Sequence, residues 1–200
     1  MGYVNYDSIF NKIANCPRAH EKAAQMAERR FIVAKQELLE EFDNSKVTQE
    51  IQAGPELDGS KILPKGYGNL SSFLGFHDGR EPIGPVRRKL ENITMLKRPQ
   101  VTKKYWIFKV YIPTKGELEK ASPMDWESGR SWLNAVTKGL SGFSHYIFTL
   151  SRNIGRSGSA VQATGNSVKS SVRSGSEYFG GTSYVFGMLG RFARRITRTQ

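Results

Sequence analysis

The chain has 200 residues, of which 38% are apolar and 11% aromatic, enough to build a hydrophobic core and to exclude a wholly disordered protein. Thirty basic residues against 18 acidic ones give a net charge of +12, which favours an anionic partner such as nucleic acid, an acidic lipid surface or an acidic protein face. The single cysteine, Cys16, excludes an intramolecular disulfide and a thiolate zinc site, and indicates a reducing compartment. No stretch has the length and apolarity of a membrane helix, and the first residues lack a signal-peptide pattern, so we expect a soluble protein.

The first 45 residues form an expected helical segment. Apolar residues three or four apart run along one face from Ala24 to Phe42. Because proline is tolerated only in a first helical turn, we predict a short helix over residues 6–15 and a long amphipathic helix that begins near Pro17 and ends at "FDNS". We interpret its acidic cluster as a solvated face rather than a catalytic pair; the cluster consists of Glu37, Glu40, Glu41 and Asp43.

Residues 46–150 are expected to form an α+β core. The stretch "VTQEIQAGPELDGSKILPKGYGN" is rich in Gly and Pro and predicts a loop, with one helical turn at Val47–Ile51. The apolar run Leu70–Phe76 has the length of a strand. A short helix then starts with a proline, with Pro82, Ile83, Val86 and Leu90 on its inner face and Arg87, Arg88 and Lys89 on its outer face.

The clearest strand is "KKYWIFKVYIP", in which Trp106, Phe108, Val110 and Ile112 alternate with Tyr105, Ile107, Lys109 and Tyr111. The first face is expected to be buried. The second is half aromatic, which suggests that the long helix or a neighbouring subunit covers it too. We predict that "NITMLK" is its antiparallel partner, after a turn that contains Pro99.

A further helix and strand complete this core. Ser122 is the expected helix cap, with Pro123 in the first helical position and Asp125 in the capping-box position. Leu133, Val136 and Leu140 continue the helical face until Gly139 and Gly142 end it, and "FSHYIFTL" then predicts a strand. Together these elements indicate an α+β fold with a mostly antiparallel sheet.

Residues 151–200 form a basic arm rich in Ser, Gly and Arg, which carries +7 of the net charge of +12. The tetrapeptide RSGS occurs twice in it, and "SAVQAT" and "SVKSSV" alternate around Gly165–Asn166 in the manner of a β-hairpin. A terminal amphipathic helix follows, with Val185, Met188, Leu189, Phe192 and Ile196 on one face.

Four interpretations of this arm stay open. It is a solvated, partly disordered appendage, a nucleic-acid contact, a helix lying on a membrane, or an element whose apolar residues pack against neighbouring copies of the chain. The membrane helix is disfavoured because Gly187 and Gly190 interrupt it, and the last interpretation explains most of the composition.

The patterns of enzymes and cofactor-binding proteins do not occur. His20, His77 and His145 are far apart and in no metal-ligand spacing, and no glycine-rich phosphate loop or nucleophile elbow occurs. We therefore expect a protein that is not an enzyme and has no metal or cofactor.

Three segments, taken together, resemble a known class of proteins. "GYGNLSSFLGF", "PMDWESGRSWLNAVTKGLSGFSHYI" and "RSGSAVQ" are similar, in that order, to segments of small virion proteins of tailed bacteriophages, of the neck or tail-completion kind. The element W-x-x-G-R-S-W, from Trp126 to Trp132, carries most of this resemblance. The "VTQEIQAGP" stretch fits it as well, whereas the arginine content of the terminal helix departs from it.

The resemblance implies a long N-terminal helix packed on a small antiparallel sheet, and a ring, usually hexameric, in the neck of the virion. Such a ring joins head to tail and completes or terminates the tail tube around the DNA channel. The partners would be further copies of the chain, adjacent connector and tail-tube or tail-sheath proteins, and genomic DNA without sequence preference. The ring would assemble in the host cytoplasm, with no role for a membrane.

Two sets of residues are candidates for these contacts. The candidate contacts to the DNA channel or a partner are Arg156, Arg173, Arg191, Arg194, Arg195 and Arg198. The candidate core or subunit-interface anchors are Phe73, Phe76, Trp106, Phe108, Trp126 and Trp132. The alternative functions are a basic nucleic-acid-binding protein and a baseplate or other minor tail component.

Overall fold

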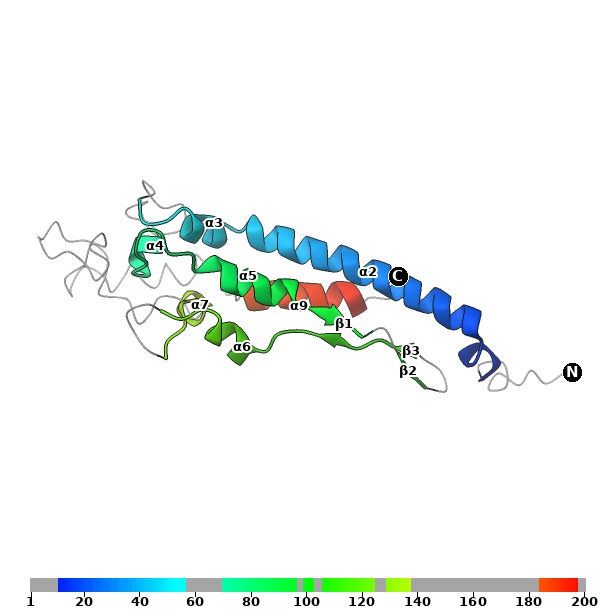
Figure 1. Cartoon of the computed structure of the whole chain (residues 1–200). Helices are drawn as coiled ribbons and strands as arrows, with labels where there is room; N and C mark the ends of the chain where they lie inside the picture. Colours follow the sequence, from blue (N-terminus) through cyan, green and yellow to red (C-terminus); the bar gives the residue numbers. More distant parts are fainter. Residues whose placement is uncertain are drawn as a thin grey trace, which may run out of the picture.

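The computed structural model of the protein describes residues 11–56, 70–96, 99–102, 106–124, 129–137 and 184–197. These parts combine helices with small antiparallel sheets, as expected (Figure 1). The helices are α2 (Pro17–Asp43), α3 (Lys46–Gln52), α4 (Leu70–Phe73), α5 (Ile83–Glu91), α6 (Lys115–Lys120), α7 (Trp132–Thr137) and α9 (Tyr184–Thr197). The strands are β1 (Thr94–Met95), β2 (Gln100–Val101), β3 (Trp106–Ile107) and β4 (Val110–Tyr111).

Helix α2 confirms the predicted long helix and both of its ends. Pro17 stands in its first turn, where the missing N–H would have had no helical partner. The helix ends where the backbone N–H of Asn44 donates to the carbonyl of Glu40 at 2.9 Å and that of Ser45 donates to the carbonyl of Phe42 at 3.2 Å. Residues 11–14, just before it, are also helical.

The strand predicted over Leu70–Phe76 is wrong, because this segment is helical. Residues 70–73 form α4, and the N–H of Leu74 extends the turn by donating to the carbonyl of Leu70 at 2.9 Å. The buried carboxylate of Glu50, on α3, accepts the N–H of Leu70 at 2.7 Å. A short apolar run has no period that separates strand from helix, and here a residue 20 positions earlier satisfies the first amide of the helix. Helix α3 confirms the helical turn that was predicted at Val47–Ile51.

The predicted hairpin is present with a different layout. Met95 pairs with Val110, and Val101 pairs with Trp106, both antiparallel. Pro99 therefore lies between the two paired sections rather than in the turn, and the chain reverses after Val101. The registers of the two pairings differ by two residues, so the strands are interrupted between them.

The helix predicted to start at Ser122 instead starts at Trp132. Ser122 belongs to a loop closed by two backbone hydrogen bonds, from Met124 N–H to the Arg130 carbonyl and from Trp132 N–H to the Ser122 carbonyl, each 2.9 Å. The hydroxyl of Ser131 caps α7, accepting the N–H of Asn134 at 3.2 Å. Asp125, Leu140, Gly139, Gly142 and the strand expected at "FSHYIFTL" lie outside the described residues.

Helix α6 was not predicted, although its signal was in the sequence. The hydroxyl of Thr114 accepts the N–H of Glu117, and the carboxylate of Glu117 accepts the N–H of Thr114 at 2.8 Å. This reciprocal capping box follows the T-x-x-E pattern of "TKGE" and fixes the start of the helix.

The core is held mainly by α2 and α9, which run antiparallel. Tyr184, at the start of α9, stacks on Phe42 near the end of α2, and Phe192 meets Phe31 edge-on. The apolar face predicted for α9 is confirmed, because Val185, Met188, Leu189 and Phe192 are buried. The chain's own core thus covers these residues, and no neighbouring copy is needed to do so. The main packing partners of α2 in the described part are α9 and α5 rather than the sheet (Figure 1).

Candidate assembly and anion-binding surfaces

Two of the candidate DNA-contacting arginines form ion pairs within the chain. Arg191 Nε donates to Glu41 Oε1 at 2.7 Å, and Arg195 Nε lies 3.0 Å from Glu37 Oε2. Arg195 Nη1 also lies 3.5 Å from Glu41 Oε2, as an ion pair without hydrogen-bond geometry. These contacts join α9 to α2 beside the buried apolar face.

The pairing has an electrostatic reason. The acidic cluster of α2 lies toward the C-terminal end of that helix, where the helix dipole is negative and carboxylates are unfavourable. Arginines supplied by the neighbouring helix offset both the cluster and the dipole. Glu37 and Glu40 are exposed, which agrees with the expected solvated face, although Glu37 pairs with Arg195 and Glu40 accepts a hydrogen bond from Gln36 at 3.0 Å. Glu41 and Asp43 are partly buried and pair with arginines of other helices.

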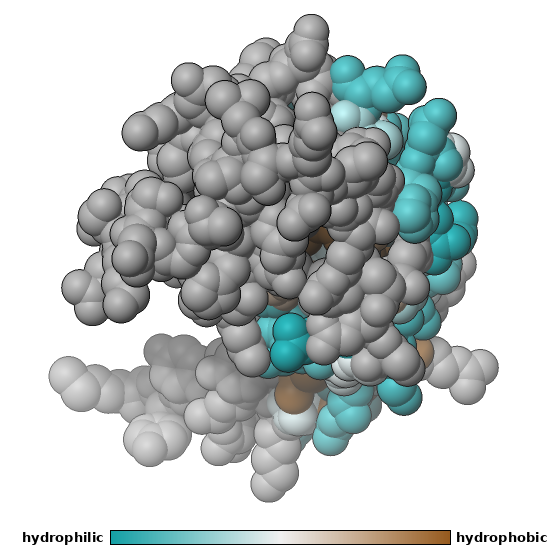
Figure 2. All heavy atoms as spheres, turned by 90° about the vertical axis from the view of Figure 1, so that its left-hand side faces the viewer, coloured by the Kyte–Doolittle hydropathy of each residue, from teal (hydrophilic) through white to brown (hydrophobic). Residues whose placement is uncertain are grey.

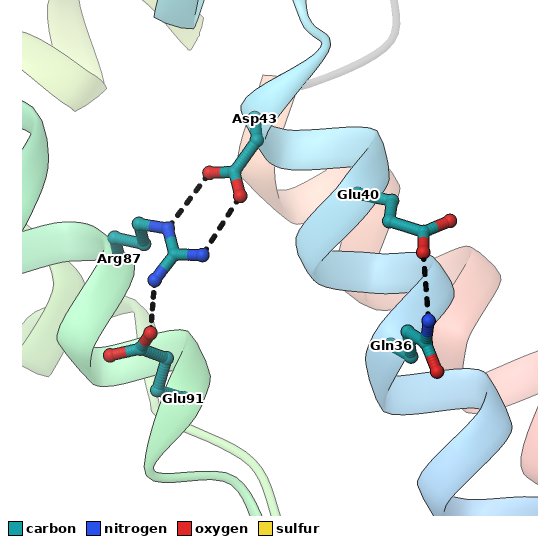
Figure 3. A network of polar contacts seen from close by, with 5 residues as sticks. All are labelled: Gln36, Glu40, Asp43, Arg87 and Glu91. Atoms are coloured by element: carbon teal, nitrogen blue, oxygen red, sulfur yellow. Dashed lines mark hydrogen bonds and ion pairs between the residues drawn. The ribbon is translucent and has the colours of Figure 1, made fainter.

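A third arginine ties α5 to α2 (Figure 3). Arg87 donates two hydrogen bonds of 2.9 Å to the two carboxylate oxygens of Asp43, and it also contacts Glu91 one helical turn along α5. The hydrogen bonds with Asp43 raise the pKa of Arg87 above its ordinary value. Asp43 and Arg87 are 44 positions apart, so no local spacing could have revealed the pair.

We expect the substitution Arg87→Ala to lower the free energy of unfolding by about 1 kcal/mol, because the pair is bidentate but only half-buried. Arg88→Ala is the matched control, since Arg88 is the next residue and is exposed. Urea denaturation of the two variants measures the difference. Equal losses from both would show that the network adds nothing beyond general charge removal.

The aromatic candidates divide between the core and the hairpin. Trp132 is fully buried and meets the ring of Phe76, also buried, edge-on at 6.3 Å. Trp106 and Phe108 are half-buried on the inner face of the hairpin, where Trp106 meets His20 of α2 edge-on at 6.2 Å. The structure therefore gives Trp132 and Phe76 the core role and places Trp106 at the contact between the hairpin and α2.

The remaining candidates are only partly described. Arg194 is exposed on α9, in the last turn of that helix, where a cation suits the dipole. The backbone of Phe73 belongs to α4. Trp126, Arg156, Arg173, Arg198 and the predicted arm hairpin with its two RSGS copies lie outside the described residues, as does the side chain of Phe73.

The large apolar side chains exposed in the described part gather on two elements. On the hairpin these are Leu96, Val101, Ile107 and Tyr111. On the N-terminal helices they are Ile13, just before α2, and Met26, Ile32 and Val33 in the first two-thirds of α2. At the end of the molecule where α3 and α4 lie, the visible described surface is mainly hydrophilic (Figure 2). Among the described residues, the large exposed apolar side chains thus lie on the hairpin, on α2 and on the helical residues just before α2.

The outer face of the hairpin is fixed to α6 by one side chain. The Tyr111 hydroxyl contacts the Glu117 carboxylate, which also accepts the capping-box hydrogen bonds from Thr114. The hydrogen bond from Tyr111, followed by those from Thr114, lowers the pKa of Glu117 to about 2. The carboxylate therefore stays charged at neutral pH and holds the ring of Tyr111 in place.

One buried polar contact of the core joins α9 to α3. The hydroxyls of Tyr184 and Thr48 meet between α9 and α3, and burial raises the pKa of Tyr184. Tyr184 is thus a neutral partner that satisfies the buried Thr48 hydroxyl.

Within the described ranges, no group of three His, Cys, Asp or Glu side chains is placed to hold a metal ion. The helices of the same ranges include none long and apolar enough to cross a membrane. The chain matches no protein-family model, no curated protein and no solved structure.

Proposed function

We propose that this chain is a non-enzymatic structural protein of a tailed-phage virion, which forms a ring in the neck and joins head to tail around the DNA channel. The observation that carries the proposal is the outer face of the hairpin, where Ile107 and Tyr111 are 42% and 50% exposed. A two-stranded ribbon with its inner face on the core and an apolar outer face suits an assembly in which another protein covers it.

The sequence resemblance to tailed-phage neck proteins indicates that the assembly is a ring. Its strongest element, W-x-x-G-R-S-W, ends at Trp132 in the core, and the described parts of its surroundings are the closed loop at Ser122 and the start of α7. The resemblance therefore falls on a structural part of the molecule. This is compatible with a fold held in common rather than with a shared chemical site.

The basic residues are better suited to line a DNA channel than to recognise a particular nucleotide sequence. The ion pairs of Arg191 and Arg195 with α2 remove two of the four arginines that a terminal nucleic-acid grip would use. We propose that Arg194 and the arginines at 156, 173 and 198 face DNA or an adjoining ring, through phosphate contacts that are independent of sequence.

The test is a joining assay. Filled heads and free tails, prepared from an infection in which this chain is not made, are mixed with the purified chain. We expect infectious joined particles, and rings in electron micrographs of the chain bound to tails. Infectious particles formed without the chain, or a chain that stays monomeric and leaves heads and tails unjoined, would overturn the proposal.

The nucleic-acid alternative makes a different prediction in the same preparations. It requires tight DNA or RNA binding by the free chain with a steep dependence on salt. Such binding without any effect on joining would favour that alternative.

A further inference from the structure

Helix α2 is divided into a basic half and an acidic half. Residues 17–30 include four basic and two acidic side chains, and residues 31–43 include one basic and four acidic ones. The acidic half is paired with arginines of α5 and α9. In the basic half, Arg18, Lys22 and Arg29 form no ion pair with any residue that the structure describes. Their charges are therefore available to another molecule.

These three cations lie on one side of α2, in a line of side chains that we call the α2 ridge. The α2 ridge consists of the exposed residues Arg18, Lys22, Met26, Arg29 and Val33. At 3.6 residues per turn, the five positions fall within an arc of about 80°. The buried residues Ala34, Leu38 and Phe42 lie on the opposite side of the helix. Figure 1 shows α5, α9 and the hairpin together on one side of α2, so no described element covers the ridge.

The charges of the α2 ridge oppose the stability of the helix itself. Arg18 and Lys22 are like charges one helical turn apart, which is unfavourable. Arg18 also lies in the first turn, which contains no acidic residue and where the helix dipole favours anions. Glu21, an acid near Arg18 on the helix, accepts a hydrogen bond from Gln25 at 3.4 Å instead. Departures from local stability of this kind are expected at functional sites, and an anionic partner would offset them.

We propose that the α2 ridge binds the phosphate backbone of double-stranded DNA. Arg18 and Arg29 are 11 positions apart, so the cations extend over about 16 Å of helix. Along that length one DNA strand presents about five phosphates. Lysine and arginine contact phosphates without reading the base sequence, and the net charge of +12 attracts a polyanion over longer distances. The contact does not depend on the proposed ring; only the orientation of α2 toward a DNA channel rests on that function.

A lipid surface and an acidic protein fit the α2 ridge less well. A helix that lies on a membrane inserts a broad apolar face. The apolar face of α2 is instead packed inside the molecule, against α9 and α5, and the ridge itself has only Met26 and Val33 between its cations. Protein surfaces intersperse charges of both signs, whereas DNA carries one negative charge per about 1.7 Å of its axis. A row of cations without acids is therefore best matched by DNA.

Binding of a fluorescent DNA duplex to the full-length chain tests the proposal. The ridge variant carries Arg18→Gln, Lys22→Gln and Arg29→Gln, because glutamine keeps a high helix propensity. The matched control carries Lys46→Gln, Arg88→Gln and Lys120→Gln, at exposed positions on α3, α5 and α6. Both variants lower the net charge from +12 to +9, so they differ only in where the cations are removed.

Fluorescence anisotropy at about 50 to 200 mM salt gives the affinity and its dependence on salt. Each phosphate contact contributes about 0.9 to the slope of log affinity against log salt concentration. We expect the ridge variant to lose about 2–3 from this slope and about tenfold or more in affinity at low salt, equally for duplexes of different sequence. The control should lose less than about 1 from the slope. The single variant Lys22→Gln should lose about 1.

Urea denaturation shows that a loss of binding is not a loss of fold. The ridge variant should be at least as stable as the wild-type chain, because its three side chains are exposed and the repulsion between positions 18 and 22 is gone. An intact ridge variant with weakened DNA binding supports the contact.

The opposite results are equally clear. Equal losses from the ridge variant and the control would overturn the proposal, because binding would then follow net charge alone. Phosphatidylserine vesicles or polyglutamate that bind more tightly than the duplex, and lose this binding in the ridge variant, would overturn it in favour of a membrane or an acidic protein. A wild-type chain that joins heads to tails but binds no duplex at low salt would overturn the contact and leave the ring function intact. Ridge-dependent DNA binding by a chain that joins nothing would support the contact and count against the proposed function.

Discussion

Replacing Phe192 with alanine will lower the free energy of unfolding by about 3–5 kcal/mol, because the ring is fully buried between α9 and α2 and its loss leaves a cavity. An effect of this size is a large part of the stability of an ordinary domain. It would show that α9 is part of the core rather than an appendage. Denaturant titration followed by tryptophan fluorescence measures it.

The matched control for Phe192→Ala is Arg194→Ala, on the exposed side of the same helix. We expect it to change the free energy of unfolding by less than about 0.5 kcal/mol. Similar small effects from both variants would mean that α9 contributes nothing to the fold in solution, and that its apolar face is covered only in an assembly.

The substitution Trp132→Ala will cost about 3–5 kcal/mol, since Trp132 is fully buried against Phe76 at the start of α7. Trp132→Phe should lose less, because a ring remains to meet Phe76. The decisive measurement is the dependence on protein concentration. A core residue destabilises the monomer at every concentration, whereas an interface anchor acts only where copies associate.

A concentration-dependent loss would contradict the core role of Trp132. Trp106→Phe serves as the comparison, because Trp106 is half-buried at the contact between the hairpin and α2. We expect it to cost less than Trp132→Ala under the same conditions.

Local patterns in the sequence were enough to predict the elements that turn one face toward the core. The 3.6-residue period of α2 and of α9 predicted their buried sides, and Pro17 predicted where α2 starts. Alternation predicted the hairpin, because each successive strand residue turns to the opposite face. These signals depend on the chain itself and not on which element covers the face.

The wrong predictions share a different cause. The segment at Leu70 became helical where the Glu50 carboxylate caps its first amide, and Ser122 closed a loop with Trp132 instead of starting a helix. In both places the apolar pattern or the cap signal fits more than one structure. The choice was made by a hydrogen-bond partner from another part of the chain.

The sequence by itself determined which sides of the two principal helices and of the hairpin face the core, because amphipathic periods are properties of consecutive residues. Only the tertiary structure decided which charges are available to a partner. The acids of α2 meet Arg87, Arg191 and Arg195 across 44 to 158 positions, so charges that look exposed in the sequence are used to hold helices together. It also decided that the apolar face of α9 is covered from within, and that the hairpin and α2 keep exposed apolar side chains.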